Sequence, residues 1–147
     1  MKLILLLPGC IVPLLACGAG TPRGGGPNGC ALGEIPLQPP DSVPGWVYDP
    51  ANVVRGTWIA GAYARDVLVI AFVPGTNERA RAEAVCAVDG VVIGGHRWDG
   101  AEGRYFIRIP PDPTQQRLRR AVAILDALPQ VSLVTPEFIG VIGPAGG

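Results

Sequence analysis

The segment that decides the fold is residues 67–73, VLVIAFV, which is followed by the turn residues Pro74, Gly75 and Thr76. A continuous apolar run rich in β-branched residues predicts a strand buried on both faces or nearly so, because a half-exposed strand would alternate apolar and polar residues. Proline and glycine end such a strand, since proline lacks a backbone N–H and glycine favours a turn. The run therefore predicts the central strand of a sheet.

A helix is predicted directly after this strand. Thr76 is a suitable N-cap, Glu78 lies in the first turn, and Gly90 ends the pattern. The positions that share one helical stripe are small or apolar: Ala82, Val85, Cys86 and Val88.

A second helix is predicted to begin after Pro110 and Pro111. Asp112 and Gln115 have the spacing of a capping box, and Pro113 occupies the first helical position. The apolar residues that repeat at helical spacing before Pro129 are Leu118, Ala121, Val122, Leu125 and Leu128.

Two strands are predicted between the helices. The first begins at residues 91–93, and the second is residues 104–109 (RYFIRI), with the turn signal Asp99-Gly100 between them. Alternation places Tyr105, Ile107 and Ile109 on one face of the second strand and Phe106 and Arg108 on the other. The two strands should therefore form a hairpin, with Asp99 and Glu102 as solvated turn residues.

The order of elements predicts the fold class. A fourth strand, residues 131–134, follows the second helix, so the series is strand, helix, strand, strand, helix, strand. Right-handed crossovers fold this series into an α+β, ferredoxin-like βαββαβ domain, with a four-stranded antiparallel sheet and two helices on one face. The predicted domain covers residues 67–140, and residues 141–147 form a C-terminal tail.

The N-terminus has the layout of a secretory signal over residues 1–16, with one lysine before an apolar run that is too short to span a bilayer. Residues 14–17 (LLAC) resemble a bacterial lipobox, which predicts lipidation of Cys17 and a membrane anchor. Gly18 in place of aspartate favours the outer membrane or cell surface. The alternative is an ordinary signal peptide cut near Ala16 or Ala19, with Cys17 incidental.

Residues 17–66 are expected to form a flexible tether and linker, because glycine and proline recur too often for regular structure. Within this segment, residues 53–62 are apolar enough for a short strand or for packing on the domain. Trp46, Tyr48 and Trp58 are candidate anchors that dock the linker on the domain; an exposed aromatic binding surface is the alternative.

The cysteines divide between the signal and the exported chain. Cys10 leaves with the signal and Cys17 carries the lipid, which leaves Cys30 and Cys86 in an oxidising compartment. They either form one disulfide, or Cys86 is a small apolar helix residue and Cys30 is a free or intermolecular thiol. Two cysteines without a nearby histidine predict no metal site, and no cofactor is expected.

Charge and composition argue against two classes of function. The 12 basic residues balance the 12 acidic ones, and no basic run is long enough to follow a phosphate backbone, so nucleic acid is not an expected partner. His96 is the only histidine, and no Ser-His-Asp triad can be assembled around it. A non-catalytic protein is therefore expected.

The C-terminal half resembles the N-terminal prodomain of subtilisin-like serine proteases, an inhibitor I9-like domain, and in particular the fervidolysin-like variety. The matching elements are VLVIAFVPGT, DGVVIGG, YFIRIPP, LDALPQV and VSLVTPEFI, each in the family's order. The likeness covers about 75 residues, from Asp66 to Gly140.

The resemblance implies a stand-alone inhibitor or folding helper of a subtilisin-like protease. Family prodomains place the outer face of the sheet against the protease, which makes Phe106 and Arg108 candidate contacts; packing of Phe106 under the middle segment is the alternative. The family's C-terminal tail enters the substrate groove, and here the corresponding residues are Phe138, Ile139, Gly140, Val141 and Ile142. Two other functions stay open: a lipid-anchored interaction module, or a truncated protease prodomain with no role of its own.

Overall fold

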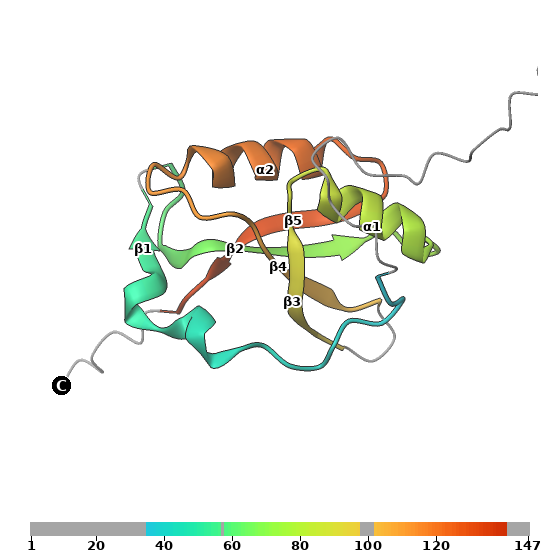
Figure 1. Ribbon diagram of the computed structural model, residues 1–147, viewed down its shortest axis with the longest axis horizontal. Helices are drawn as coiled ribbons and strands as arrows, with labels where there is room; N and C mark the ends of the chain where they lie inside the picture. Colours follow the sequence, from blue (N-terminus) through green and yellow to red (C-terminus); the bar gives the residue numbers. More distant parts are fainter. Residues whose placement is uncertain (1–34, 57, 98–101, 141–147) are drawn as a thin grey trace, which may run out of the picture.

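The structure is a computed structural model that describes residues 35–56, 58–97 and 102–140 (Figure 1). The predicted signal, Cys17, Cys30 and the tail residues 141–147 lie outside the described residues, as do Trp98 and Asp99 of the predicted turn.

The predicted central strand is confirmed as β2 (Ala62–Phe72), which pairs antiparallel with two longer strands and one short one. Its partners are β4 (Arg104–Arg108), β5 (Val131–Phe138) and β1 (Val53–Arg55). Leu68, Val69 and Ile70 are each at most 3 % exposed, although successive residues point to opposite faces. Both faces of β2 are therefore covered, as the continuous apolar run predicts.

The protein is α+β, with an antiparallel sheet and two helices. The strand path is β1-β2-β4-β3, and β5 pairs β2 off this path. The predicted hairpin is present, because β3 (Val91–His96) pairs antiparallel with β4. The sheet has five strands where the sequence predicted four. The additional strand arises because residues 53–55 fold back onto the start of β2.

Both helices pack on the same side of the sheet, which Figure 1 shows as α1 (Glu78–Cys86) and α2 (Gln116–Asp126) lying above the strands. The main core cluster joins them to every second residue of β2. Its helix residues are Ala82, Ala84 and Val85 from α1 and Leu118, Ala121 and Leu125 from α2, and its β2 residues include Leu68, Ile70 and Phe72.

The helix starts differ from the prediction by a few residues. Asn77, not Thr76, caps α1 by accepting a hydrogen bond from the N–H of Ala80 at 2.8 Å, because the Thr76 hydroxyl donates to Val73 in the preceding turn. α2 begins at Gln116, after Gln115 takes a left-handed conformation with φ of 60°.

The Asp112 carboxylate still serves the start of α2, accepting from the N–H groups of Thr114 and Arg117, each at 2.9 Å. These two backbone hydrogen bonds are the main reason that the pKa of Asp112 lies below its ordinary value.

The alternation predicted for residues 104–109 is confirmed. Tyr105, Ile107 and Ile109 belong to the main cluster beneath the helices, whereas Phe106 belongs to a second cluster on the opposite face. The second cluster also contains Val67 and Val69 of β2. A sheet with apolar residues on both faces needs a cover on each side.

The second cover comes from residues 43–52, which we call the strap. The strap contains two 3₁₀ helices, η1 (Gly45–Tyr48) and η2 (Pro50–Asn52), and it lies on the face away from α1 and α2 (Figure 1). Val47 of η1 is completely buried against Val67, Val69 and Phe106. The packed part of the chain therefore starts well before residue 67, which the sequence predicted as the domain boundary.

Two glycines of β3 allow the chain before the strap to approach closely. A Cβ at Gly94 would lie 2.1 Å from the carbonyl oxygen of Ser42, and a Cβ at Gly95 would lie 2.4 Å from Cβ of Pro39. Because neither glycine has a Cβ, the chain comes close enough for the N–H of Gly95 to donate to the Ser42 carbonyl at 2.9 Å. Residues 39–42 thus lie along the β3 edge, in a segment that the sequence predicted as linker.

The buried stripe of α2 yields a stability prediction. Leu125 is fully buried in the main cluster, so Leu125→Ala should lower the free energy of unfolding by about 2 to 5 kcal/mol, from lost burial and the cavity left behind. Chemical denaturation followed by circular dichroism measures the change. Leu133→Ala on partly exposed β5 is the matched control and should cost less than about 1 kcal/mol. A loss below about 1 kcal/mol for Leu125→Ala would contradict the packing.

Candidate functional site

The part of the chain that the structure describes ends two residues after β5. The Phe138 ring meets the Tyr63 ring edge-on, with centroids 6.5 Å apart. The N–H of Ile139 donates to the Ala62 carbonyl at 2.9 Å, and its side chain packs against the second cluster. Gly140 is exposed, and nothing lies within 4 Å of the position its Cβ would take.

These contacts divide the residues predicted to bind a protease groove. Phe138 and Ile139 are part of the folded body, whereas Gly140 is the first position with open space around it. Val141 and Ile142 lie outside the described residues. The segment that could enter a groove without unfolding the body therefore starts at Gly140.

The two predicted sheet-face residues lie under the strap. Phe106 is 3 % exposed and packs in the second cluster with Val47, so its ring is covered by this chain. The Arg108 guanidinium stacks over the Trp46 ring, 4.7 Å from its centroid, and pairs with the Asp66 carboxylate at 3.0 Å. The face predicted to meet a partner is thus occupied by residues 46 and 47.

Polar groups gather at the rim of the same face. The Tyr48 hydroxyl donates to the Glu137 carboxylate over 3.4 Å, which joins the strap to β5. Burial raises the pKa of Glu137 above its ordinary value, against the opposing effects of the Tyr48 hydrogen bond and the positive fields of His96 and Arg104. The His96 ring packs edge-on against Phe106, with centroids 5.3 Å apart.

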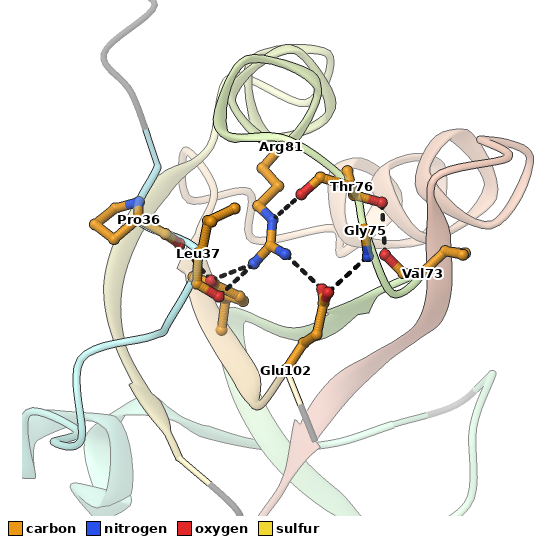
Figure 2. Close-up of polar contacts among 8 residues, drawn as sticks. Pro36, Leu37, Val73, Gly75, Thr76, Arg81 and Glu102 are labelled. Atoms are coloured by element: carbon orange, nitrogen blue, oxygen red, sulfur yellow. Dashed lines mark hydrogen bonds and ion pairs between the residues drawn. The ribbon is translucent and has the colours of Figure 1, made fainter. Parts of the chain in front are cut away.

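The most developed polar network of the described residues centres on Arg81, which the sequence analysis did not single out. Its side chain is 1 % exposed and extends from α1 into a ring of acceptors (Figure 2). It donates to the carbonyls of Thr76 and Leu37, each at 2.8 Å, to the Tyr105 hydroxyl at 2.6 Å, and to the Glu102 carboxylate.

Glu102 and Tyr105 extend this network to other parts of the chain. The Glu102 carboxylate also accepts from the N–H of Gly75 at 2.7 Å, so it is not the solvated turn residue that the sequence predicted. The Tyr105 hydroxyl donates to the carbonyl of Pro36. Burial raises the pKa of Tyr105 above its ordinary value, against the opposing effect of the Arg81 guanidinium.

The sequence gives one indication that Arg81 is buried. It lies four residues before Val85, next to the apolar stripe that holds Ala82 and Cys86. A buried arginine needs acceptors, and its acceptors come from distant segments. The network ties α1, the turn after β2, β4 and the N-terminal residues 36–37 together. Its chemistry is structural, since each nitrogen of the guanidinium already donates to an acceptor within the chain.

Cys86 is disulfide-bonded, and it lies buried in α1. It is the only cysteine among the described residues, so its partner lies outside them. Pairing with Cys30 stays a prediction.

Nowhere in residues 35–56, 58–97 and 102–140 do three or more His, Cys, Asp or Glu side chains come together in a way that could hold a metal ion. In the same ranges, no helix has the length and hydropathy needed to cross a bilayer.

Comparison with models of known families, with curated proteins and with solved structures finds no match to this chain. Its function is therefore inferred from its own residues.

The Arg81 network yields the second prediction. Glu102→Ala should lower the free energy of unfolding by about 3 kcal/mol, because it leaves a buried guanidinium without its carboxylate. Combined with Arg81→Met, the loss should be smaller than the sum of the two single losses, which a double-mutant cycle by chemical denaturation measures. Glu83→Ala removes an exposed partner of Arg79 and should change stability by no more than about 0.5 kcal/mol. If Glu102→Ala and Glu83→Ala change the free energy of unfolding equally, the buried Arg81–Glu102 pair does not stabilise the fold.

Proposed function

We propose that this protein is an exported, lipid-anchored and non-catalytic module that binds and inhibits a subtilisin-like serine protease, or assists its folding. The observation that carries the proposal is the place where the body ends. Ile139 is held by the Ala62 carbonyl, and the next residue, Gly140, stands in open space. The chain that follows can enter a groove at no cost to the packed core.

We also infer that β2 to β5 and the two helices follow the ferredoxin-like arrangement of a protease prodomain. The pairing supports this inference, because residues 68–70 of β2 pair with β4 and also with β5, which must lie on opposite sides of it. With the short β1 set aside, and β3 beyond β4, this gives the order β5-β2-β4-β3. Both helices share one core cluster with β2, as that arrangement requires.

An extended tail is suited to a protease groove because substrates bind there as strands. The backbone pairs with the groove edge, and alternate side chains fill pockets. Val141 and Ile142 are the apolar residues of the tail, whereas Gly143, Pro144 and the terminal glycines offer little to fill a pocket. Val141 and Ile142 are therefore the proposed pocket residues.

Deletion of residues 140–147 separates binding from folding. The melting temperature should stay almost unchanged, because nothing lies within 4 Å of the position a Gly140 Cβ would take, and terminal residues contribute few packed contacts. Inhibition of a subtilisin-like protease from the same bacterium should weaken at least tenfold, equivalent to about 1.4 kcal/mol. Inhibition constants and thermal melts of the full and shortened proteins measure both effects.

A paired substitution localises the effect within the tail. Val141→Ser combined with Ile142→Ser should reproduce most of the loss, whereas Pro144→Ala should have little effect. If the shortened protein inhibits as well as the full one, the tail does not occupy the groove. If neither protein binds any subtilisin-like protease, the function is that of an interaction module with another partner.

The anchor is tested separately in cells. Cys17→Ser should release the protein from the membrane fraction, because a chain without a lipidated cysteine keeps no acyl anchor. The folded domain should persist, since the described body begins at Ile35. Membrane fractionation with immunodetection measures the partition, and Cys10→Ser, within the signal, serves as the control. An unchanged membrane fraction for Cys17→Ser would exclude lipidation at this residue.

A further inference from the structure

An open cavity, which we call the α1–α2 cavity, lies between the end of α1 and one side of α2. Its volume is about 330 Å³, which is within the range of sites that hold small molecules. One wall is the turn after α1, with Ala87 and Asp89, and the other wall is α2, with Arg117, Arg120 and Ile124. None of the lining residues belongs to the strap or to the C-terminal tail.

Three charged side chains of the cavity are free to meet a ligand. Among the described residues, the Asp89 carboxylate and the guanidinium groups of Arg117 and Arg120 form no hydrogen bond or ion pair. Asp112, also in the lining, is occupied, since its carboxylate accepts from the N–H groups of Thr114 and Arg117. The Arg117 guanidinium helps to lower the pKa of Asp112 without forming an ion pair with it.

The two walls of the cavity have opposite electrostatic character. α1 ends on the wall that holds Asp89, so the partial negative charge of its carboxyl end adds to that carboxylate. α2 begins on the wall that holds Arg117 and Arg120, where the partial positive charge of its amino end has the same sign as theirs. With Asp112 included, the lining carries two positive and two negative side chains. A neutral molecule with separated charges fits this field better than a simple anion or cation.

The remaining lining of the cavity is largely apolar. Val88 and Ala121 are buried, at 6 % and 3 % exposure, and Ala87 and Ile124 are partly buried. A small apolar group of a ligand that lies against these side chains is removed from water, which favours binding. Apolar surface between a few convergent polar groups is typical of small-molecule sites.

We propose that the α1–α2 cavity binds a small zwitterion with a free ammonium and a free carboxylate, the chemistry of a dipeptide. The ammonium pairs with Asp89, and the carboxylate pairs with Arg117 and Arg120, whose forked donors match its two oxygens. An apolar side chain of the ligand lies against Ile124. This site does not depend on the proposed protease, so either can fail without the other.

The test uses the dipeptide alanyl-leucine and two matched ligands that each lack one charge, its N-acetylated form and its C-amidated form. Titration of the full chain with alanyl-leucine, followed by amide chemical shifts in NMR, should give saturable shifts at Asp89, Arg117 and Arg120. Because each terminal charge has its own partner in the cavity, removal of either charge should raise the dissociation constant at least tenfold.

Substitutions assign each charge to its partner. Asp89→Asn suits the backbone at this position, where φ is 53°, because asparagine tolerates the left-handed conformation. This variant should bind the free and the N-acetylated dipeptide equally while still preferring both to the C-amidated form. Arg117→Gln combined with Arg120→Gln should instead lose the preference for a free carboxylate. Arg79→Gln, at an exposed arginine of α1 outside the cavity, is the matched control and should bind as the wild type does.

The comparison of the three ligands on the wild-type protein decides the proposal even if a variant fails to fold. Absence of a saturable shift with alanyl-leucine overturns the site. Equal binding of the three forms overturns the zwitterion, since neither charge is then recognised. If Asp89→Asn and the double arginine variant fold and keep the wild-type preferences, the dipeptide binds elsewhere, and the assignment to this cavity is wrong. A loss of affinity in Arg79→Gln equal to that in the double arginine variant would indicate only general attraction to surface charge and would also overturn it.

Discussion

Nine of the eleven residues of β2 are buried, on both faces of the sheet, and the rest of the molecule follows from that constraint. An apolar strand paired on both sides must also be covered above and below, or its side chains stay exposed. The helices cover Leu68 and Ile70, and the strap covers Val67 and Val69. The two covers differ in kind: the first consists of two regular helices, and the second is an irregular segment in which only Val47 is fully buried.

Residues 36–37, which precede the strap, are held by hydrogen bonds on the side of the sheet that the helices cover. Arg81 projects from α1 and donates to the carbonyl of Leu37, while Tyr105 donates to that of Pro36. A buried cation is costly unless its donors are satisfied, so the network forms only when all its segments are in place. The N-terminal segment, α1 and the turn after β2 are thereby expected to order cooperatively, and the disulfide at Cys86 lies in the same helix.

Much of the fold could be predicted because its elements have strong local patterns. The run at residues 67–73 predicts a buried strand by its continuous β-branched apolar composition, and the α2 stripe through Leu118 and Leu125 predicts a helix by its periodicity. The strap has no periodicity, so the sequence predicted that Trp46 and Tyr48 would dock it on the domain but did not predict its two 3₁₀ helices or the burial of Val47. Arg81 lies beside the predicted stripe of α1 and was not predicted to be buried, because its acceptors, such as Glu102, are distant in the sequence. The groove residues stay a proposal from the sequence, whereas the packing of Phe138 and Ile139 on the sheet depends on contacts with Tyr63 and Ala62 that only the structure shows.

The close approach of residues 39–42 to Gly94 and Gly95 also affects how molecules of this protein associate at high concentration. Open sheet edges recruit strands from neighbouring molecules, and natural proteins block them. Here the β3 edge is occupied near its end by the Ser42 carbonyl, and the β5 edge is interrupted by Pro136, which has no N–H to donate. A larger residue at Gly94 or Gly95 would displace the chain at Ser42 and free one of these edges. The two small residues thus protect the protein from edge-to-edge polymerisation wherever it is held at high local concentration.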